Sequence, residues 1–166
     1  MATTKLTWET ATTGTGGVHS LASSSDFTAG YEWFVITNSA SLDLDFAVQG
    51  TVRVGTTPTA GTQIRVWVVG SYDGTTWPSP VAGSAAARTW ATAGARDSVA
   101  KLAAVLSVDA ATTDADYDFF FTLGSLFGGI VPKKVSVYLS HNTAVALEAT
   151  SGNQKYAYVG VYTTTV

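Results

Sequence analysis

Residues Thr62–Trp77 read TQIRVWVVGSYDGTTW, and this stretch decides the fold class. Along residues 64–69 the side chains alternate in the period-2 pattern of a β-strand that buries one face. Asp73-Gly74 then predicts a tight hairpin turn, because such a turn needs a positive φ at its centre. Trp77 begins a returning strand, which the proline after it soon interrupts. We expect a central strand, a turn and the start of a second strand.

The rest of the chain repeats this mixture of short apolar strands and turn residues. Stretches rich in aromatic and β-branched residues occupy residues 31–37, 43–54, 117–123, 132–140 and 154–163. With turn signals between them, they predict about eight strands and at most one helical turn. Strands at this spacing indicate an all-β fold, an antiparallel two-sheet β-sandwich of jelly-roll-like type. Its expected core residues are Phe46, Val48, Val66, Val68, Phe119, Phe121, Val137 and Leu139.

Two stretches carry finer expectations. Residues 43–54, DLDFAVQGTVRV, alternate cleanly, so that Leu44 and every second residue after it face one side. Gly50 falls on that apolar face, where a close neighbour is the usual reason for a glycine. Residues 98–108, SVAKLAAVLSV, fit either a helical stripe or a strand, and the apolar run at their end favours the strand.

The composition is unusual for a globular domain. Of the 166 residues, 46% are hydrophobic and 11% aromatic, but only 13% are charged. About 25% charged residues is typical. Much of the surface must consist of Thr, Ser, Ala, Gly and Asn. So little charge suits a protein that packs against copies of itself or related subunits, although a sparsely charged Thr-rich domain would have the same composition.

Charge and residue types exclude several classes of function. A net charge of −3 and dispersed Lys and Arg residues argue against nucleic acid as a partner. The sequence contains no cysteine, which rules out disulfides and zinc–thiolate sites. No apolar run approaches the length of a membrane span, and the first residues do not form a secretory signal. We expect synthesis in the cytoplasm, no membrane association and no cofactor.

Residues 1–26 are dominated by Thr, Ser and Gly. They predict an extended N-terminal arm with the character of a loop, followed by a β-sandwich domain at residues 27–166. Leu6 and Trp8 are among the few large apolar side chains of the arm. They could anchor it on its own domain or on a neighbour, and both alternatives stay open.

No arrangement of reactive residues indicates catalysis. The histidines, His19 and His141, lie in predicted loops far apart in the sequence, and no serine stands in a positioned-nucleophile motif. Asp114, Asp116 and Asp118 could offer oxygen ligands to calcium, but the glycine and glutamate of an EF-hand loop are missing. We expect neither an enzyme nor a metal site.

Tyr72, Trp77 and Trp90 raise a further hypothesis. Exposed aromatic rings beside Asp and Asn side chains can stack on sugar rings. β-Sandwich domains commonly bind saccharides in this way. The same rings could instead close the ends of the sandwich.

Three segments resemble a known group of proteins: VRVGTTPTAGTQIRVWVVGSYDGTTWP, SVAKLAAV and LFGGIVPKKVSVYLSHNTAVALEATSGN. They are similar to small β-rich structural proteins of tailed bacteriophages, and the resemblance runs from roughly Phe46 to Tyr162. It rests on strand and turn segments, so no functional residues come with it. It implies a jelly-roll virion component, in particular a capsid decoration (cement) protein. Residues 1–25 fall outside the resemblance.

The resemblance also implies partners and a location. These are the capsid surface of the virion, the major capsid protein or other virion proteins, and a homotrimer. Low charge and apolar residues on nominally outer strand faces independently favour self-association. The candidate interface residues are Leu6, Trp8, Trp67, Val69 and Phe120. The alternative function is a head-fibre or tail-associated module that binds host-surface saccharide through the three aromatic rings named above.

Overall fold

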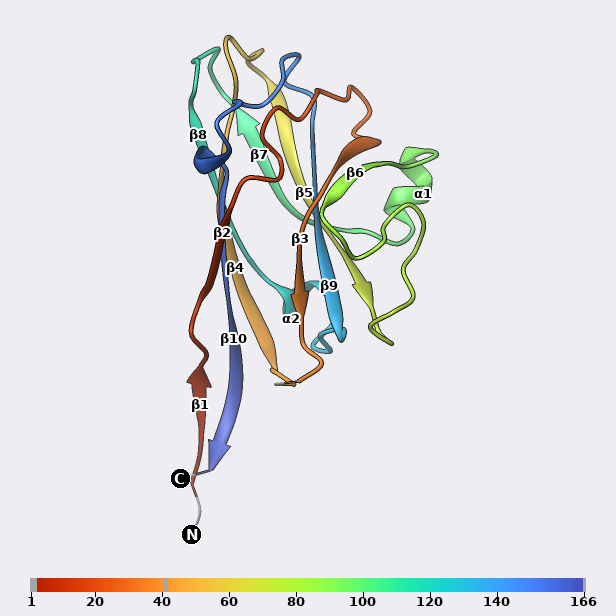
Figure 1. The fold of residues 1–166 in the computed structure, drawn as a ribbon, viewed down its shortest axis with the longest axis vertical. Helices are drawn as coiled ribbons and strands as arrows, with labels where there is room; N and C mark the ends of the chain where they lie inside the picture. The colour runs from red at the N-terminus through yellow and green to blue at the C-terminus, as the bar shows by residue number, and fades with distance from the viewer. Residues whose placement is uncertain (1–2, 41, 166) are drawn as a thin grey trace.

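The structure is a computed structural model that describes residues 3–40 and 42–165. The chain folds into a sandwich of two antiparallel β-sheets with very little helix (Figure 1). The strands are β1 Thr4–Trp8, β2 Thr12–Thr15, β3 Ala29–Thr37, β4 Asp45–Arg53, β5 Thr62–Ser71, β6 Ala86–Thr89, β7 Lys101–Val108, β8 Asp116–Thr122, β9 Lys134–His141 and β10 Lys155–Thr165. The helical segments are α1 Ala93–Asp97, α2 Leu123–Leu126 and the 3-10 turn η1 Ser151–Asn153. The predicted all-β sandwich is confirmed, with more strands than expected.

Strands from distant parts of the sequence become neighbours in both sheets. The first sheet has the order β1-β10-β4-β8, with β2 also paired to β10. The second sheet has the order β6-β3-β9-β5-β7. Most connections carry the chain from one sheet to the other, as in jelly-roll-like sandwiches. This winding brings both ends of the chain together in the first sheet.

The core lies between the two sheets, and every residue predicted for it is buried. These residues are Phe46, Val48, Val66, Val68, Phe119, Phe121, Val137 and Leu139. Aromatic rings fill part of the space. Phe34 stacks on Tyr156 with 3.9 Å between ring centroids, and Trp33 meets both rings edge-on. Trp33 is held there because its Nε1 donates a 2.6 Å hydrogen bond to the Gly16 carbonyl.

Strand β4 follows its predicted alternation from Phe46 onward. Leu44 precedes the strand and is 53% exposed, so its predicted inward orientation is wrong. Gly50 has the close neighbours expected of it. A Cβ at this position would lie 2.5 Å from the Phe119 ring and 2.7 Å from the carbonyl oxygen of Lys155.

Most of the ambiguous stretch at residues 98–108 is a strand, β7 from Lys101 to Val108, as the sequence favoured. The single turn of α1 ends just before it. Thr92 caps the start of that turn, because its Oγ1 accepts a hydrogen bond from the Ala95 amide over 3.0 Å.

The hairpin predicted after β5 is wrong. Asp73 and Gly74 do form a tight turn, in which Gly74 has a φ of +81°. The Asp73 carboxylate accepts hydrogen bonds from the amides of Thr75 and Thr76 and so fixes the turn. β5 nevertheless pairs with β7 and β9, and the chain beyond Trp77 leaves the sheet. Turn chemistry determines the local backbone, whereas the pairing partner depends on the rest of the sheet.

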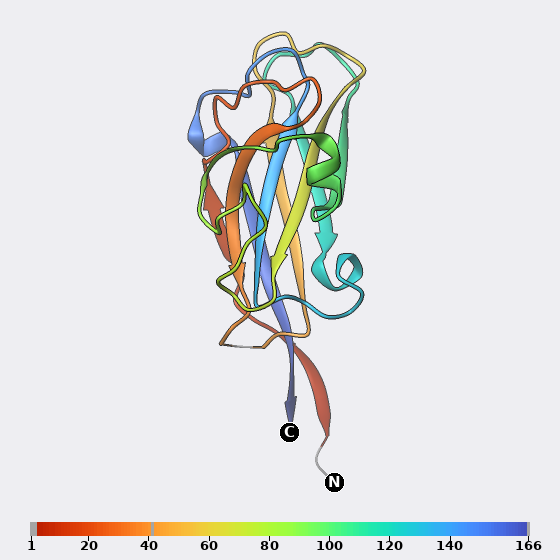
Figure 2. The ribbon, with the colours of Figure 1, turned by 90° about the vertical axis from the view of Figure 1, so that its right-hand side faces the viewer.

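Residues 77–100, the covering segment, form the edge strand β6 of the second sheet and, before and after β6, cross the outer face of that sheet (Figure 2). Val81, Trp90 and Ala100 of this segment pack against Trp67, Val69 and Tyr138 of the sheet and form a second apolar cluster. Trp67 and Val69 are 5% and 0% exposed. The prediction that these two side chains present an outer interface is wrong, because the chain's own covering segment buries them.

Glu32 of β3 fastens the covering segment to the sheet. Its carboxylate is fully buried and accepts hydrogen bonds from the backbone amides of residues 82–84. Arg88 Nε forms an ion pair with Glu32 Oε2 at 3.0 Å, and Ser136 donates to Oε1 over 2.8 Å. A buried carboxylate without donors would be strongly destabilising, so the loop and the carboxylate stabilise each other.

Much of the predicted N-terminal arm belongs to the sandwich. β1 and β2 both pair with β10, and Val18 is fully buried in the core. The interpretation of residues 12–26 as a loop without packing is corrected. Among the described residues of the predicted arm, β1 extends beyond the sandwich, together with the end of β10 (Figure 1).

Phe119 and Phe120 are adjacent in β8 but are 6% and 65% exposed. We expect Phe119→Ala to lower the free energy of unfolding by about 3–5 kcal/mol, because it empties a packed core site. Phe120→Ala should change it by less than about 0.5 kcal/mol. Urea denaturation followed by far-UV circular dichroism would measure both values. Equal effects of the two substitutions would contradict the assigned strand faces.

Candidate functional site

β1 and the end of β10 form a two-stranded ribbon beyond the sandwich (Figure 1). β1 pairs with β10 from Thr4 opposite Thr165 to Trp8 opposite Val161. β4 pairs with β10 only as far as Val161, so β1 is the sheet neighbour of the last residues of β10. We call β1 together with Val161–Thr165 the projecting ribbon.

The projecting ribbon exposes apolar side chains that no second sheet covers. Leu6 and Trp8 lie on the same face of β1 and are 65% and 62% exposed. A two-stranded ribbon by itself is only marginally stable in water. Among the described residues β1 pairs with β10 alone, and Lys5 is the one charged side chain of the ribbon. A weakly charged open edge of this kind favours pairing with another chain.

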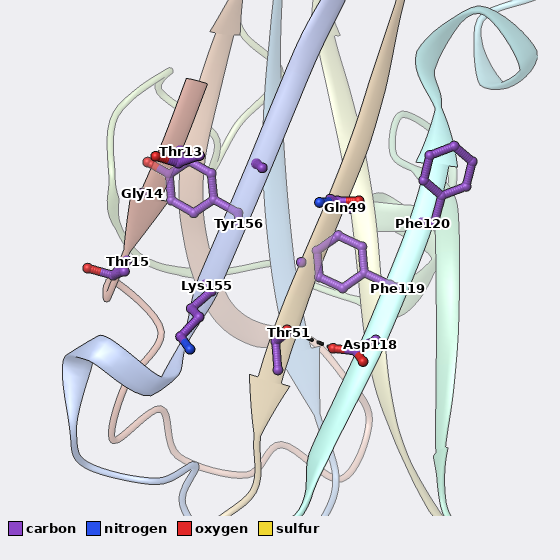
Figure 3. Close-up of a pocket in the computed structure, with 12 residues that line it drawn as sticks. Thr13, Gly14, Thr15, Gln49, Thr51, Asp118, Phe119, Phe120, Lys155 and Tyr156 are labelled. Carbon is purple, nitrogen blue, oxygen red and sulfur yellow. Dashed lines mark hydrogen bonds between the residues drawn. The ribbon is translucent and has the colours of Figure 1, made fainter. Parts of the chain in front are cut away.

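The outer face of the first sheet carries a groove of about 950 Å³ (Figure 3). Cross-strand pairing places its outward side chains in two rows over β2, β10, β4 and β8. One row is Thr15, Lys155, Thr51 and Asp118, and the other is Thr13, Ala157, Gln49 and Phe120. We call this surface the sheet groove. Since paired strands lie about 4.8 Å apart, each row is about 14 Å long.

The sheet groove has an apolar end and a polar remainder. Phe120 is 65% exposed at the end formed by β8. The small side chain of Ala157 lies between longer side chains, so the surface is recessed in the middle of that row. In the other row, Thr51 Oγ1 donates a 2.6 Å hydrogen bond to Asp118 Oδ1, as the dashed line in Figure 3 shows. That bond orients the carboxylate.

The candidate interface residues separate into two groups. Leu6, Trp8 and Phe120 are exposed, all of them in the first sheet. Trp67 and Val69 are buried in the second sheet, as described above. The first sheet therefore holds the remaining candidates for contact with another molecule.

The three aromatic rings proposed to face a ligand have different environments. Tyr72 is 61% exposed in the turn after β5. Trp77 is partly buried, with its ring against Gly83. Trp90 is 2% exposed and packs edge-on against Tyr138. The prediction of three exposed rings for stacking is wrong, because Trp90 packs inward from the covering segment onto the sheet and Trp77 is partly buried.

The acidic residues at the start of β8 have structural partners. Asp116 forms a two-point ion pair with Arg53, with both N–O distances at 2.7 Å. This hydrogen-bonded guanidinium lowers the pKa of Asp116. Asp118 is held by Thr51. Among the described residues, no group of three or more His, Asp or Glu side chains could hold a metal ion.

In that same part of the chain, no helix is long and apolar enough to cross a membrane.

Sequence reasoning missed both the sheet groove and Glu32. The groove combines side chains from four strands, whose register a single sequence does not reveal. Glu32 did leave a signal, since it is the one charged residue within the strand sequence YEWFVIT. A lone charge in such a strand calls for a buried partner.

No model of a known protein family matches this chain, and no curated protein matches it either. The projecting ribbon and the sheet groove are assigned from the geometry above.

His141 allows a test of how the fold responds to pH. Its side chain is fully buried at the end of β9, where Nε2 donates to the Leu21 carbonyl over 2.9 Å. Burial lowers the pKa of His141 from 6.5 to about 4. Protonation of the imidazole is therefore less favourable in the folded than in the unfolded state. The contribution of neutral His141 to stability is complete above pH 6.5 and is lost as the pH falls toward 4.

We expect His141 to reduce the free energy of unfolding by up to about 3 kcal/mol over this pH range. Asp43 titrates in the opposite sense, since burial and the charge of Glu9 raise its pKa. Urea denaturation of the unmodified protein and of His141→Asn across the range separates the two effects. The variant should show the flatter pH dependence, and an equally steep loss of stability would contradict this assignment.

Proposed function

We propose that this chain is a non-enzymatic structural protein of a bacteriophage virion, namely a decoration (cement) protein that stabilises the capsid by bridging its subunits. The proposal starts from the resemblance of residues 46–162 to small structural proteins of tailed phages. Low charge, at 13% of residues, and the exposed apolar side chains of the first sheet support it. The partners are the major capsid protein and further copies of this chain, on the capsid surface after synthesis in the host cytoplasm.

The projecting ribbon is the observation that carries this proposal. It reaches beyond the sandwich and exposes Leu6 and Trp8. Large aromatic anchors supply much of the binding energy at interfaces. The open backbone edge of β1 can also add to a neighbouring subunit through main-chain hydrogen bonds. Because β10 already holds β1 extended, binding does not have to order a free arm.

We expect the purified protein to self-associate as a homotrimer. Exposed apolar side chains of the first sheet, Leu6, Trp8 and Phe120, favour self-association, and the trimer follows from the resemblance to the phage proteins. Sedimentation velocity at micromolar concentration would measure the oligomeric state. A strictly monomeric protein under these conditions would count against self-association.

Replacing both Leu6 and Trp8 by serine should weaken attachment to capsids by about tenfold or more, because it removes the apolar anchors. Co-sedimentation with capsids that lack the protein would measure attachment. Tyr72→Ser is the matched control, since Tyr72 is 61% exposed but lies outside the projecting ribbon. Unchanged attachment of the double variant would exclude the ribbon as the anchor.

A deletion that ends after β1 also tests whether the projecting ribbon attaches the protein to capsids. Removing residues 1–9 takes away the first strand of the ribbon and leaves the core intact. Removing residues 1–25 would also delete β2 and the buried Val18, so a loss of attachment could then reflect unfolding. Circular dichroism of the shorter deletion should match that of the full chain.

A head-fibre or tail-associated protein is the alternative position in the particle. A cement protein is present in proportion to the capsid protein, whereas a fibre or tail-tip protein is present in far fewer copies. Gel densitometry of purified virions distinguishes the two.

A further inference from the structure

An exposed aromatic ring marks one end of the sheet groove (Figure 3). Phe120 is 65% exposed on the outer face of β8, whereas Phe119 and Phe121 on either side of it are buried. The negative face of an aromatic ring attracts groups that carry partial positive charge. The polarised C–H groups on the apolar face of a sugar ring are such groups. Phe120 therefore offers a stacking surface for a sugar.

Hydrogen-bonding side chains continue along both rows from this ring. Gln49, directly opposite Phe120, has an amide that can donate and accept. Asp118 is an acceptor oriented by Thr51, and Lys155 is a donor in the same row. Sugar hydroxyls both donate and accept hydrogen bonds. The groove supplies both kinds of partner beside the ring.

The charge of the groove favours a neutral ligand. Its lining contains one cationic side chain, Lys155, and one anionic side chain, Asp118. The neighbouring pair of Arg53 and Asp116 is already neutralised by its own ion pair. An anionic ligand such as a sulfated or sialylated glycan would meet the Asp118 carboxylate without an excess of positive charge to offset it.

The dimensions of the groove favour a short oligosaccharide over a single sugar. Each row is about 14 Å long from β2 to β8. The volume of about 950 Å³ lies in the range of small-molecule sites. Because Ala157 is small, the surface is recessed in the middle of the row that contains Phe120. A ligand can therefore lie along that row from Phe120 toward β2.

From these features we propose that the sheet groove binds a neutral oligosaccharide. Phe120 stacks on one sugar ring, while Gln49, Asp118 and Lys155 bind hydroxyl groups of the adjoining part of the chain. The groove is a different surface from the projecting ribbon, so sugar binding is tested separately from capsid attachment through Leu6 and Trp8. Phe120 is shared with the apolar set that favours self-association, so the oligomeric state of the Phe120 variant is measured beside its sugar binding. The proposal also places sugar recognition away from Tyr72, Trp77 and Trp90.

The test is a glycan array of neutral, sialylated and sulfated oligosaccharides probed with the full chain, followed by calorimetric titration of the best neutral glycan. We expect neutral oligosaccharides to be retained. Phe120→Ala should weaken binding by about tenfold or more through loss of stacking. Asp118→Asn should weaken it by about threefold or more, because the amide replaces one acceptor oxygen by a donor. Thermal unfolding checks that both variants fold, as expected for exposed positions.

Tyr72→Ala is the control, because Tyr72 has a similar exposed fraction, 61%, and lies outside the groove. Its binding should equal that of the unmodified protein. The proposal is overturned if no neutral glycan is retained or if only charged glycans bind. It is also overturned if Phe120→Ala binds as tightly as the control. Capsid attachment of the Phe120→Ala variant is measured in parallel and shows whether the groove contacts a capsid protein. Such contact together with an absence of sugar binding would refute the proposal.

Discussion

The buried carboxylate of Glu32 is the contact on which the layout of the molecule depends. A charged group in this position requires several donors, and residues 82–84 supply backbone amides while Arg88 supplies the opposite charge. The covering segment thus gains a fixed path over the second sheet. Without that path, Trp67 and Tyr138 would lie on an open face. Together with the apolar cluster under the segment, this buried acidic residue keeps the outer face of the second sheet enclosed.

Further contacts tie the far end of the covering segment to the same sheet. The guanidinium of Arg96 lies 4.2 Å above the Trp67 ring, and its Nη1 donates a 2.7 Å hydrogen bond to the Phe27 carbonyl. The Trp90 amide donates to the Thr28 carbonyl over 3.0 Å, and the Trp90 ring packs edge-on against Tyr138 of β9. Within residues 3–40 and 42–165, no comparable layer covers the groove strands of the first sheet. This difference places both candidate functional surfaces, the projecting ribbon and the sheet groove, on the first sheet.

The strands and the main core could be predicted because side-chain alternation is a local property. Phe46 and Val137 needed only their sequence neighbours to be assigned inward. The errors arose where distant segments decide the outcome. Trp67 has the alternation of an outward residue and is buried by a segment that starts ten residues later in the chain. Asp73-Gly74 predicted a turn correctly, but the partner of β5 was set elsewhere.

The surfaces of the first sheet were harder still to predict. The alternation of β8 placed Phe120 on the outer face of its strand, but its neighbours across the sheet could not be inferred. Gln49 lies opposite it only because β4 pairs with β8 in one register. A shift by one residue would turn these side chains to the other face. The chemistry of the groove is thus a property of strand register.

The covering segment also limits how copies of this protein can assemble. A sandwich with two bare sheet faces could stack on itself without end, as sheets do in fibres. Here β3, β9 and much of β5 are enclosed, so two molecules that joined through their first sheets would have no second broad sheet face to offer. Growth by face-to-face stacking would stop at the pair. Larger assemblies would have to be built sideways, through sheet edges or the projecting ribbon, rather than as filaments of stacked sheets.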